Sequence, residues 1–106
     1  MVRNGERAML WIDRVHRIND QAMGYTIRAN GKCYAAAAVR HRGRWGLVMD
    51  QVFEDEAGRI IGHERVRITV PQWETPGAVV QAALDVARAV ERAERRELER
   101  LGNEGR

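Results

Sequence analysis

Apolar and polar residues alternate along the middle of the chain, and one dipeptide interrupts this pattern. Asn30-Gly31 lies between residues 23–29 and residues 32–39, and Asn-Gly is the preferred pair for a type I′ turn because both of its residues need a positive φ. Side chains alternate with a period of two on either side, which is typical of strands. We therefore predict a β-hairpin with Ala29 opposite Lys32.

This register divides the side chains of the hairpin between two faces. One face, the tyrosine face, carries Tyr25, Ile27, Tyr34, Ala36 and Ala38, and the other carries Thr26, Arg28, Cys33, Ala35, Ala37 and Val39. We expect the tyrosine face to be the core, because its apolar side chains are larger and it carries no arginine. In the alternative arrangement the tyrosine face is open, and Tyr25 and Tyr34 form a platform on which RNA bases stack.

Two more strands are predicted after the hairpin, over residues 47–53 and 59–70. Gly58, in the loop that separates them, can adopt the positive φ that such a turn uses. Apolar and polar residues alternate toward the end of the second of these strands, so it buries one side only. Pro71 ends it, because proline has no N–H to donate to a sheet. The four predicted strands form an antiparallel meander.

A helix is predicted at each end of the chain. Residues 5–22 carry apolar side chains at helical spacing, with a strand over residues 9–15 as the alternative; these apolar residues are Ala8, Trp11, Ile12, Val15, Ile18 and Ala22. Thr75 and Pro76 are the N-cap and the first residue of a second helix, which continues to about Leu101. The sequence thus predicts one two-layer α+β domain over residues 1–106, in the order αββββα, with a frayed tail at residues 102–106.

The C-terminal helix is longer than the sheet that it covers. It spans about 39 Å at about 1.5 Å per residue, whereas a strand of eight residues spans about 26 Å. Its last turns therefore extend past the sheet. From Glu91 to Arg100 the charges form both favourable and unfavourable pairs four residues apart, so this overhang is either a solvated end or a helix that docks on a partner.

Basic residues are concentrated in the first half of the chain. The 106 residues carry 18 Lys and Arg against 15 Asp and Glu, a net charge of +3. Residues 1–45 hold nine basic and three acidic residues, net +6, whereas residues 46–106 hold nine and twelve, net −3. GC-rich coding sequence also produces an excess of arginine without selection for binding. The uneven distribution, however, indicates a polarised surface.

The densest cationic segment is residues 40–46, which fall at a predicted turn between two strands. Arginines on such a loop can bind phosphates, and an indole can stack on an unpaired base. The nucleic-acid interface predicted from this loop and from other cations of the first half comprises Arg40, His41, Arg42, Arg44, Trp45, Arg14, Arg17, Arg28 and Lys32. In the alternative interpretation, Trp45 closes the sheet edge and the arginines are only soluble turn residues.

The sequence carries no catalytic or metal-binding motif. Its three histidines and Cys33 fall on different predicted elements, with no two at ligand spacing, and it has no serine to act as a nucleophile. The acidic residues 54–56 are interpreted as a solvated turn rather than a cation site, and Cys33 as a small buried side chain. We therefore expect a protein that is not an enzyme and that holds no cofactor or metal.

Cysteine usage and hydropathy suggest the compartment. A single cysteine allows no internal disulfide, which favours a reducing cytoplasm. The longest apolar run, residues 33–39, is far shorter than the roughly 20 residues that cross a bilayer. No apolar stretch of the length that a signal peptide needs follows the first cation. We expect a cytoplasmic protein with no membrane partner.

Binding is the function that these features favour. We expect a small domain that binds DNA or RNA through backbone phosphates, using its basic loop and N-terminal half. The alternative is a non-catalytic protein-interaction or homodimerising module that uses an exposed strand edge or the open sheet face. The predicted order of elements is similar in outline to that of double-stranded-RNA-binding domains. Residues 76–80 lack the cations that those domains carry at the start of the last helix, so this likeness assigns no family.

Overall fold

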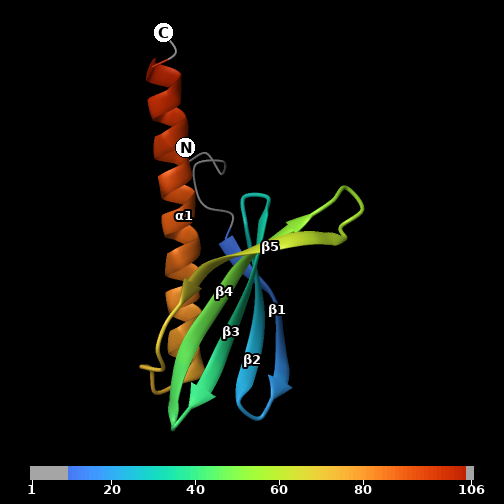
Figure 1. The fold of residues 1–106 in the computed structure, drawn as a ribbon, viewed down its shortest axis with the longest axis vertical. Helices are drawn as coiled ribbons and strands as arrows, with labels where there is room; N and C mark the ends of the chain where they lie inside the picture. Colours follow the sequence, from blue (N-terminus) through green and yellow to red (C-terminus); the bar gives the residue numbers. More distant parts are fainter. Residues whose placement is uncertain (1–9, 105–106) are drawn as a thin grey trace, which may run out of the picture.

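Five strands and one helix make up the part of the chain that the structure describes, residues 10–104 of a computed structural model. In chain order they are β1 (Leu10–Asn19), β2 (Ala22–Ala29), β3 (Lys32–His41), β4 (Arg44–Glu54), β5 (Ile60–Ile68) and α1 (Pro76–Glu104). Figure 1 shows their arrangement. Within residues 10–104, α1 is the only helix, and it has no apolar stretch long enough to cross a membrane.

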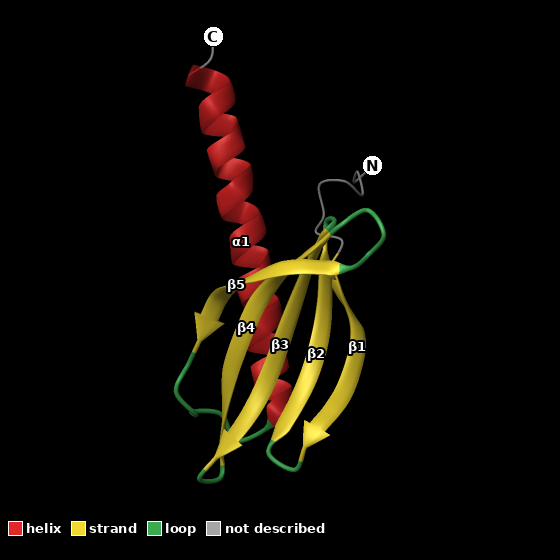
Figure 2. Ribbon diagram, turned by 45° about the vertical axis from the view of Figure 1, so that its right-hand side comes forward, coloured by secondary structure: helices red, strands yellow, loops and turns green. Residues whose placement is uncertain are grey.

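The strands form one antiparallel meander in the order β1-β2-β3-β4-β5. α1 crosses one face of this sheet and contacts β2, β3 and β4, while no described helix covers the other face (Figure 2). The predicted α+β class with an antiparallel meander is therefore confirmed. The predicted number of four strands is wrong, because the N-terminal segment contributes a fifth.

The predicted N-terminal helix is wrong where the structure describes it, because Leu10–Asn19 is the edge strand β1; residues 5–9 lie outside the described residues. A β-bulge interrupts the pairing of β1 with β2 just after Ile12. Because a bulge inserts one extra residue, Ile12 and Val15 face the same side of the sheet although they are three residues apart. Three-residue spacing is also typical of a helix, which explains the wrong prediction. The alternative prediction of a strand over residues 9–15 gave the correct type of element.

The predicted Asn30-Gly31 hairpin between β2 and β3 is confirmed. Asn30 and Gly31 have φ values of 49° and 82°, the positive values that a type I′ turn needs. Ala29 pairs with Lys32, and the register continues without a shift to the other end of β2. Side chains of the two strands therefore divide between the two predicted faces.

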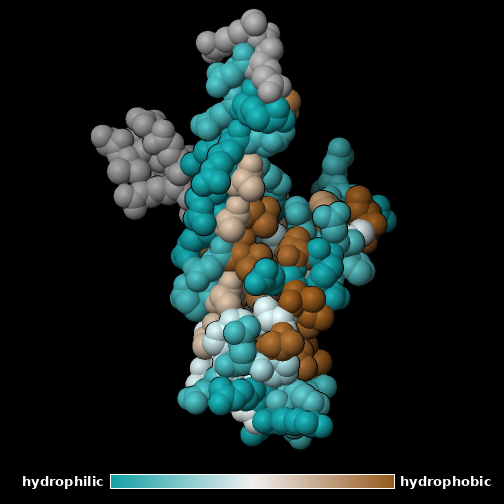
Figure 3. All heavy atoms as spheres, turned by 60° about the vertical axis from the view of Figure 1, so that its left-hand side comes forward, coloured by the Kyte–Doolittle hydropathy of each residue, from teal (hydrophilic) through white to brown (hydrophobic). Residues whose placement is uncertain are grey.

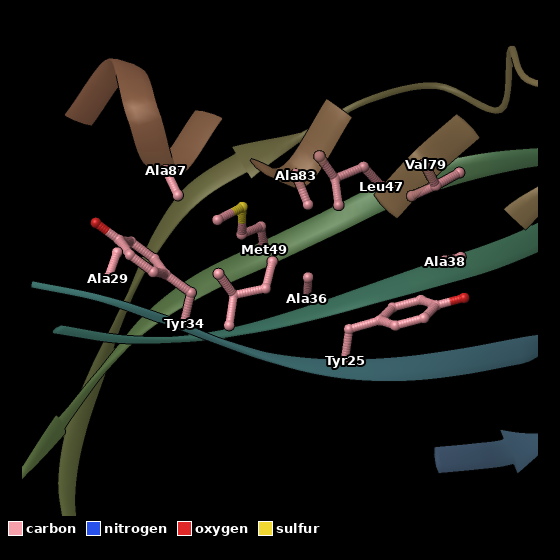
Figure 4. Packing of buried hydrophobic residues seen from close by; sticks show 11 residues of the cluster. Tyr25, Ala29, Tyr34, Ala36, Ala38, Leu47, Met49, Val79, Ala83 and Ala87 are labelled. Atoms are coloured by element: carbon pink, nitrogen blue, oxygen red, sulfur yellow. The ribbon is translucent and has the colours of Figure 1, made fainter. Parts of the chain in front are cut away.

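The tyrosine face is the core, as predicted, and α1 packs across it (Figure 4). The core cluster consists of Tyr25, Ile27, Ala29, Tyr34, Ala36, Ala38, Leu47, Met49, Val79, Ala83 and Ala87. Small alanines on both layers let the helix approach the sheet closely at interior packing density. Because Tyr25 and Tyr34 are buried here, the alternative in which they form an open stacking platform is wrong.

α1 begins as predicted and continues past the predicted end. The Oγ1 atom of Thr75 accepts the N–H of Ala78 at 3.3 Å, which is N-cap geometry, and Pro76 is the first helical residue. The helix continues beyond Leu101 to Glu104. Of the predicted tail, residues 105–106 lie outside the described residues.

Residues 69–73 follow β5 and continue beside β4, in the direction antiparallel to it, before α1 begins. The N–H of Trp45 donates to the carbonyl oxygen of Trp73 at 2.7 Å, and the N–H of Trp73 donates to the carbonyl oxygen of Trp45 at 3.0 Å. Gly46 allows the close approach of this segment, because a Cβ at Gly46 would lie 3.0 Å from the carbonyl oxygen of Thr69. The amino end of α1 is thereby held at the end of the sheet where β3 turns into β4 (Figure 1).

Candidate nucleic-acid interface

The loop predicted at residues 40–46 is the hairpin end that joins β3 to β4. Arg42 and Gly43 form its turn, with φ values of 53° and 80°. An arginine adopts this left-handed conformation at some cost, whereas glycine does so freely. On either side of the turn His41 pairs with Arg44, and Arg40 pairs with Trp45. The chain therefore presents its densest cationic segment at the end of a two-stranded turn, as predicted.

The cationic tip is the surface formed by Arg40, His41, Arg42 and Arg44, which are all exposed. Within residues 10–104, no carboxylate lies within ion-pair distance of these three arginines. The Nη1 atom of Arg44 donates to the carbonyl oxygen of Gln72 at 3.4 Å, which is a long bond to a neutral group. Among the described residues, the three arginines of the tip therefore have no carboxylate that compensates their charge.

Trp45 is not a freely exposed aromatic ring beside this tip. Its side chain is half-buried and packs against the core cluster, while its backbone pairs with Trp73. Packing of this kind is what the alternative interpretation expects of an indole that closes the sheet edge. The part of the hairpin that remains open to a ligand is therefore cationic rather than aromatic.

Arg14 and Arg17 were predicted on the outer side of a helix, but both lie on β1. Arg14 pairs with Thr26 and Arg17 with Met23, so the two side chains are on opposite faces of the sheet. Arg17 forms an ion pair with Asp20 in the turn after β1. This turn adjoins the cationic tip, because the N–H of Arg40 donates to the carbonyl oxygen of Gln21 at 2.7 Å. Arg17 thus lies near the tip. Arg14 lies on the open face, which is the face of the sheet that no described helix covers.

Arg28 is held in ion pairs on the open face, away from the cationic tip. Its guanidinium contacts Glu54 at 2.8 Å and Asp13 at 3.6 Å. The hydrogen bond to Glu54 is the main cause that raises the pKa of Arg28. This arginine therefore compensates two carboxylates, and its charge is not available to a phosphate without breaking those pairs.

Lys32 connects the β2–β3 hairpin to α1. Its Nζ atom contacts Oε2 of Glu91 at 2.9 Å and also pairs with Glu94, and the side-chain amide of Asn30 donates to Glu91 at 3.0 Å. Burial lowers the pKa of Lys32, but the hydrogen bonds to Glu94 and Glu91 outweigh that effect and raise it. Lys32 therefore stabilises the contact between helix and sheet and does not join the cationic tip.

The sheet face that no described helix covers is the second candidate surface. Gly24, Ala35 and Ala37 line a hollow of 250 Å³ in its centre. A Cβ at Gly24 would lie 2.5 Å from the imidazole of His16, so this ring lies directly over the glycine. Arg28 and Arg65 on this face are paired with carboxylates, so the face does not group uncompensated arginines as the cationic tip does.

Asp50 is the centre of a charge network on this open face. It contacts Nδ1 of His63 at 3.1 Å and also pairs with Arg65, which lies opposite it on β5. This network was not foreseen from the sequence. Alternation and the short loop would not have found it, because the pairing of β4 with β5 shifts by one residue between Phe53 and Glu54 and so changes the partner of Asp50.

Searches of protein-family models, curated proteins and solved structures find no match to this chain. Function is therefore argued from the chemistry of the surface. Among residues 10–104, no three His, Cys, Asp or Glu side chains come together as a group that could hold a metal ion. Cys33 is buried, as predicted, and this burial raises the pKa of its thiol although nearby Arg28 opposes the shift. A raised pKa keeps the thiol protonated and unreactive.

Proposed function

We propose that this protein binds nucleic acid through backbone phosphates at its cationic tip. The observation that carries the proposal is the concentration of Arg40, Arg42 and Arg44 at one hairpin end with no carboxylate within ion-pair distance in the described chain. Guanidinium groups donate paired hydrogen bonds whose geometry matches that of a phosphate. Their charge also attracts a polyanion before contact.

Most other arginines of the described chain are compensated or interleaved with acids, and Arg14 and Arg67, which have no ion pair there, are single charges on different strands. Arg28, Arg59 and Arg65 each pair with an aspartate or a glutamate. Arg92, Arg95 and Arg96 alternate along α1 with glutamates. The cationic tip differs from both groups because residues 40–46 contain no acid at all. The tip therefore groups three arginines without an acid among them.

The amino end of α1 adds to the positive potential at this end of the molecule. Its first turn contains no acidic residue, and the exposed N–H groups of a helix start carry a partial positive charge. The carboxylates in the turns at this end are Asp20, which pairs with Arg17, and Glu74, which precedes the helix. The balance of charge at this end remains positive.

The contacts that this surface offers are to phosphates rather than to bases. Trp45 is largely occupied by core packing, so stacking on an unpaired base contributes little. Phosphate contacts position a nucleic acid without selecting its sequence. We therefore propose binding that tolerates many sequences and weakens steeply as salt is added, because bound phosphates release counterions.

The proposal is tested by the salt dependence of binding to a short duplex DNA, with a duplex RNA and single strands in parallel. Each neutralised phosphate contributes about 0.9 to the slope of log K against log salt. The triple variant Arg40→Ala, Arg42→Ala and Arg44→Ala should therefore lower the magnitude of that slope by about 2 to 3. It should also weaken binding at low salt by at least about tenfold.

The matched control is the triple variant Arg92→Ala, Arg95→Ala and Arg96→Ala, which removes the same charge from exposed positions on α1. It should leave most of the slope in place. Equal losses in the two variants would mean that only net charge matters, and no binding of any nucleic acid by the unaltered protein at low salt would end the proposal.

A further inference from the structure

Two parts of the chain project from the end of the molecule opposite the cationic tip (Figures 1 and 2). One is the arm, residues 53–62, where β4 turns into β5. The other is the helix end, residues 92–104 of α1. The arm leans away from the helix, so the two diverge instead of packing on each other. Both carry large apolar side chains that the described chain leaves exposed.

The arm presents three of these side chains on an ordered hairpin. Phe53, Ile60 and Ile61 are 40%, 68% and 69% exposed. The loop that joins the two strands of the arm is internally bonded: the carboxylate of Asp55 accepts the N–H groups of Ala57 and Arg59, both at 2.9 Å. The bond from Arg59 is the main cause that lowers the pKa of Asp55. Ile60 pairs with Glu54, the neighbour of Phe53 on β4, so Phe53 and Ile60 lie on opposite faces of the hairpin and the arm is apolar on both faces.

The helix end presents two more apolar side chains. Leu98 and Leu101 are 70% and 51% exposed. Leu101 follows Ala83 by about five full turns at 3.6 residues per turn, so it lies on the side of α1 that packs on the sheet. The last ties to the sheet are the bonds of Glu91 and Glu94 to Lys32, and every residue from 92 to 103 is exposed. The apolar side of α1 thus continues past the surface that covers it.

The space-filling view shows the apolar patches of the arm and of the helix end as separate surfaces (Figure 3). In this view an apolar patch lies on the projecting arm among hydrophilic side chains, and the helix end is hydrophilic apart from a small apolar patch. Neither patch forms a continuous surface with the other on one molecule. Each is also too small to hold a large partner by itself.

We propose that a second copy of this chain covers both patches, with the arm of each copy packed against the helix end of the other. A two-fold axis makes such an exchange self-complementary, because one pairing operation covers both arms and both helix ends. It also closes after two copies, so no open-ended assembly results. Each chain has one arm and one helix end, so two copies form two equivalent contacts between an arm and a helix end.

The exposed area and the charges support this pairing. A side chain of this size exposes on the order of 150–200 Å² when fully free, so these five side chains expose on the order of 500 Å² per copy and about 1000 Å² in two copies. That is close to the lower limit for a specific interface. Glu56 on the arm loop and Arg95, one helical turn before Leu98, have no ion-pair partner in the described chain and carry opposite charges.

Sedimentation equilibrium over a concentration series tests the pairing. The unaltered chain should form a dimer. A helix variant, Leu98→Glu with Leu101→Glu, and an arm variant, Ile60→Glu with Ile61→Glu, should each raise the dissociation constant by at least about 100-fold. All four residues are exposed in one copy, so the circular dichroism spectra should stay unchanged. A control variant, Val15→Glu with Val70→Glu, alters apolar residues that are 54% and 73% exposed elsewhere and should still dimerise.

Mixing the two defective variants distinguishes the exchange from other pairings. A mixed pair keeps one intact contact, between the arm of the helix variant and the helix end of the arm variant, whereas neither variant alone keeps any. The mixture should therefore contain dimer at concentrations where each variant alone is monomeric. Failure of mixing to restore the dimer, a dimer insensitive to the arm variant, or a monomeric unaltered chain would each overturn the proposal.

Discussion

Tyr34 is the largest side chain that is fully buried in the core, and its hydroxyl has no hydrogen-bond partner in the described chain. Burial, reinforced by the charge of Glu91 and opposed by that of Lys32, raises the pKa of Tyr34 to about 12. An unpaired buried hydroxyl costs about 1–3 kcal/mol. At the residue scale the fold therefore tolerates one unfavourable polar group to keep a large ring beneath α1.

Tyr34→Phe should raise the free energy of unfolding by about 1 kcal/mol at pH 7. The substitution should also reduce the pH dependence of the free energy of unfolding above pH 10. Because the pKa is raised in the folded state, its contribution to stability is fully present below the ordinary value of 10.0 and is lost as the pH rises toward 12. Two pKa units correspond to about 2.7 kcal/mol. Urea unfolding of both proteins at pH 7, 10 and 11.5 measures the difference.

Tyr25→Phe is the control for this measurement, because burial also raises the pKa of Tyr25 although its hydroxyl is not a buried unpaired group. If Tyr34→Phe unfolds with the same alkaline loss of stability as the unaltered protein, the loss does not originate at Tyr34.

Among the elements, the segment between β5 and α1 is held against β4 by several hydrogen bonds. Gly46 is buried beneath it, and the hydrogen bonds between Trp45 and Trp73 hold its far end. The Oγ1 atom of Thr69 also accepts the N–H of Leu47 at 3.0 Å. These contacts fix where α1 starts, and hence how its alanines meet the alanines of β3.

Gly46→Ala should lower the free energy of unfolding by about 1–3 kcal/mol, in the range of overpacking substitutions. The added Cβ would lie 3.0 Å from the carbonyl oxygen of Thr69 and 3.2 Å from the nitrogen of Pro71. Both are backbone atoms that cannot rotate away. Thermal unfolding of the variant measures the effect.

Gly77→Ala is the matched control. It adds the same methyl group in the first turn of α1, where the nearest atom would be Oγ1 of Thr75 at 3.9 Å. It should leave stability unchanged or raise it by up to about 1 kcal/mol, because alanine favours helix more than glycine does. Equal stabilities of the two variants would show that the space beneath the segment is not restrictive.

On the scale of the whole molecule, the two proposed surfaces lie at opposite ends. The cationic tip and the amino end of α1 are at one end, and the arm and the helix end are at the other (Figure 1). Pairing of two copies through their arms therefore leaves both cationic tips open. Substitutions at distant sites that share no partners usually act independently.

The helix variant, Leu98→Glu with Leu101→Glu, should bind a short oligonucleotide with the affinity and salt slope of the unaltered protein, within about twofold. A short oligonucleotide is needed because a long one can bind two tips at once and gain avidity. Conversely, the triple alanine variant of the tip should keep its dimer. Fluorescence anisotropy and sedimentation measure both. A loss of dimer in the tip variant, or of tip binding in the helix variant, would show that the two ends are coupled.

The features that sequence alone predicted correctly depend on neighbouring residues. Asn30-Gly31 sets its turn through its own φ preferences, Thr75 caps the helix that begins one residue later, and the alternation of side chains selects the tyrosine face. β1 was predicted as a helix because its bulge alters the spacing of Ile12 and Val15. A bulge is stabilised by pairing with another strand, so the segment itself does not reveal it.

The cationic nature of residues 40–46 and their place at a turn follow from the sequence alone, because both depend on residues that adjoin each other. Which cations remain uncompensated was decided only by the tertiary structure. Lys32 and Arg28 were grouped with the loop, but folding brings Glu91 to the first and Glu54 to the second. Ion pairs between residues far apart in the chain form only when folding brings those residues together. The pattern of neighbouring residues in the sequence does not show which distant residues will meet.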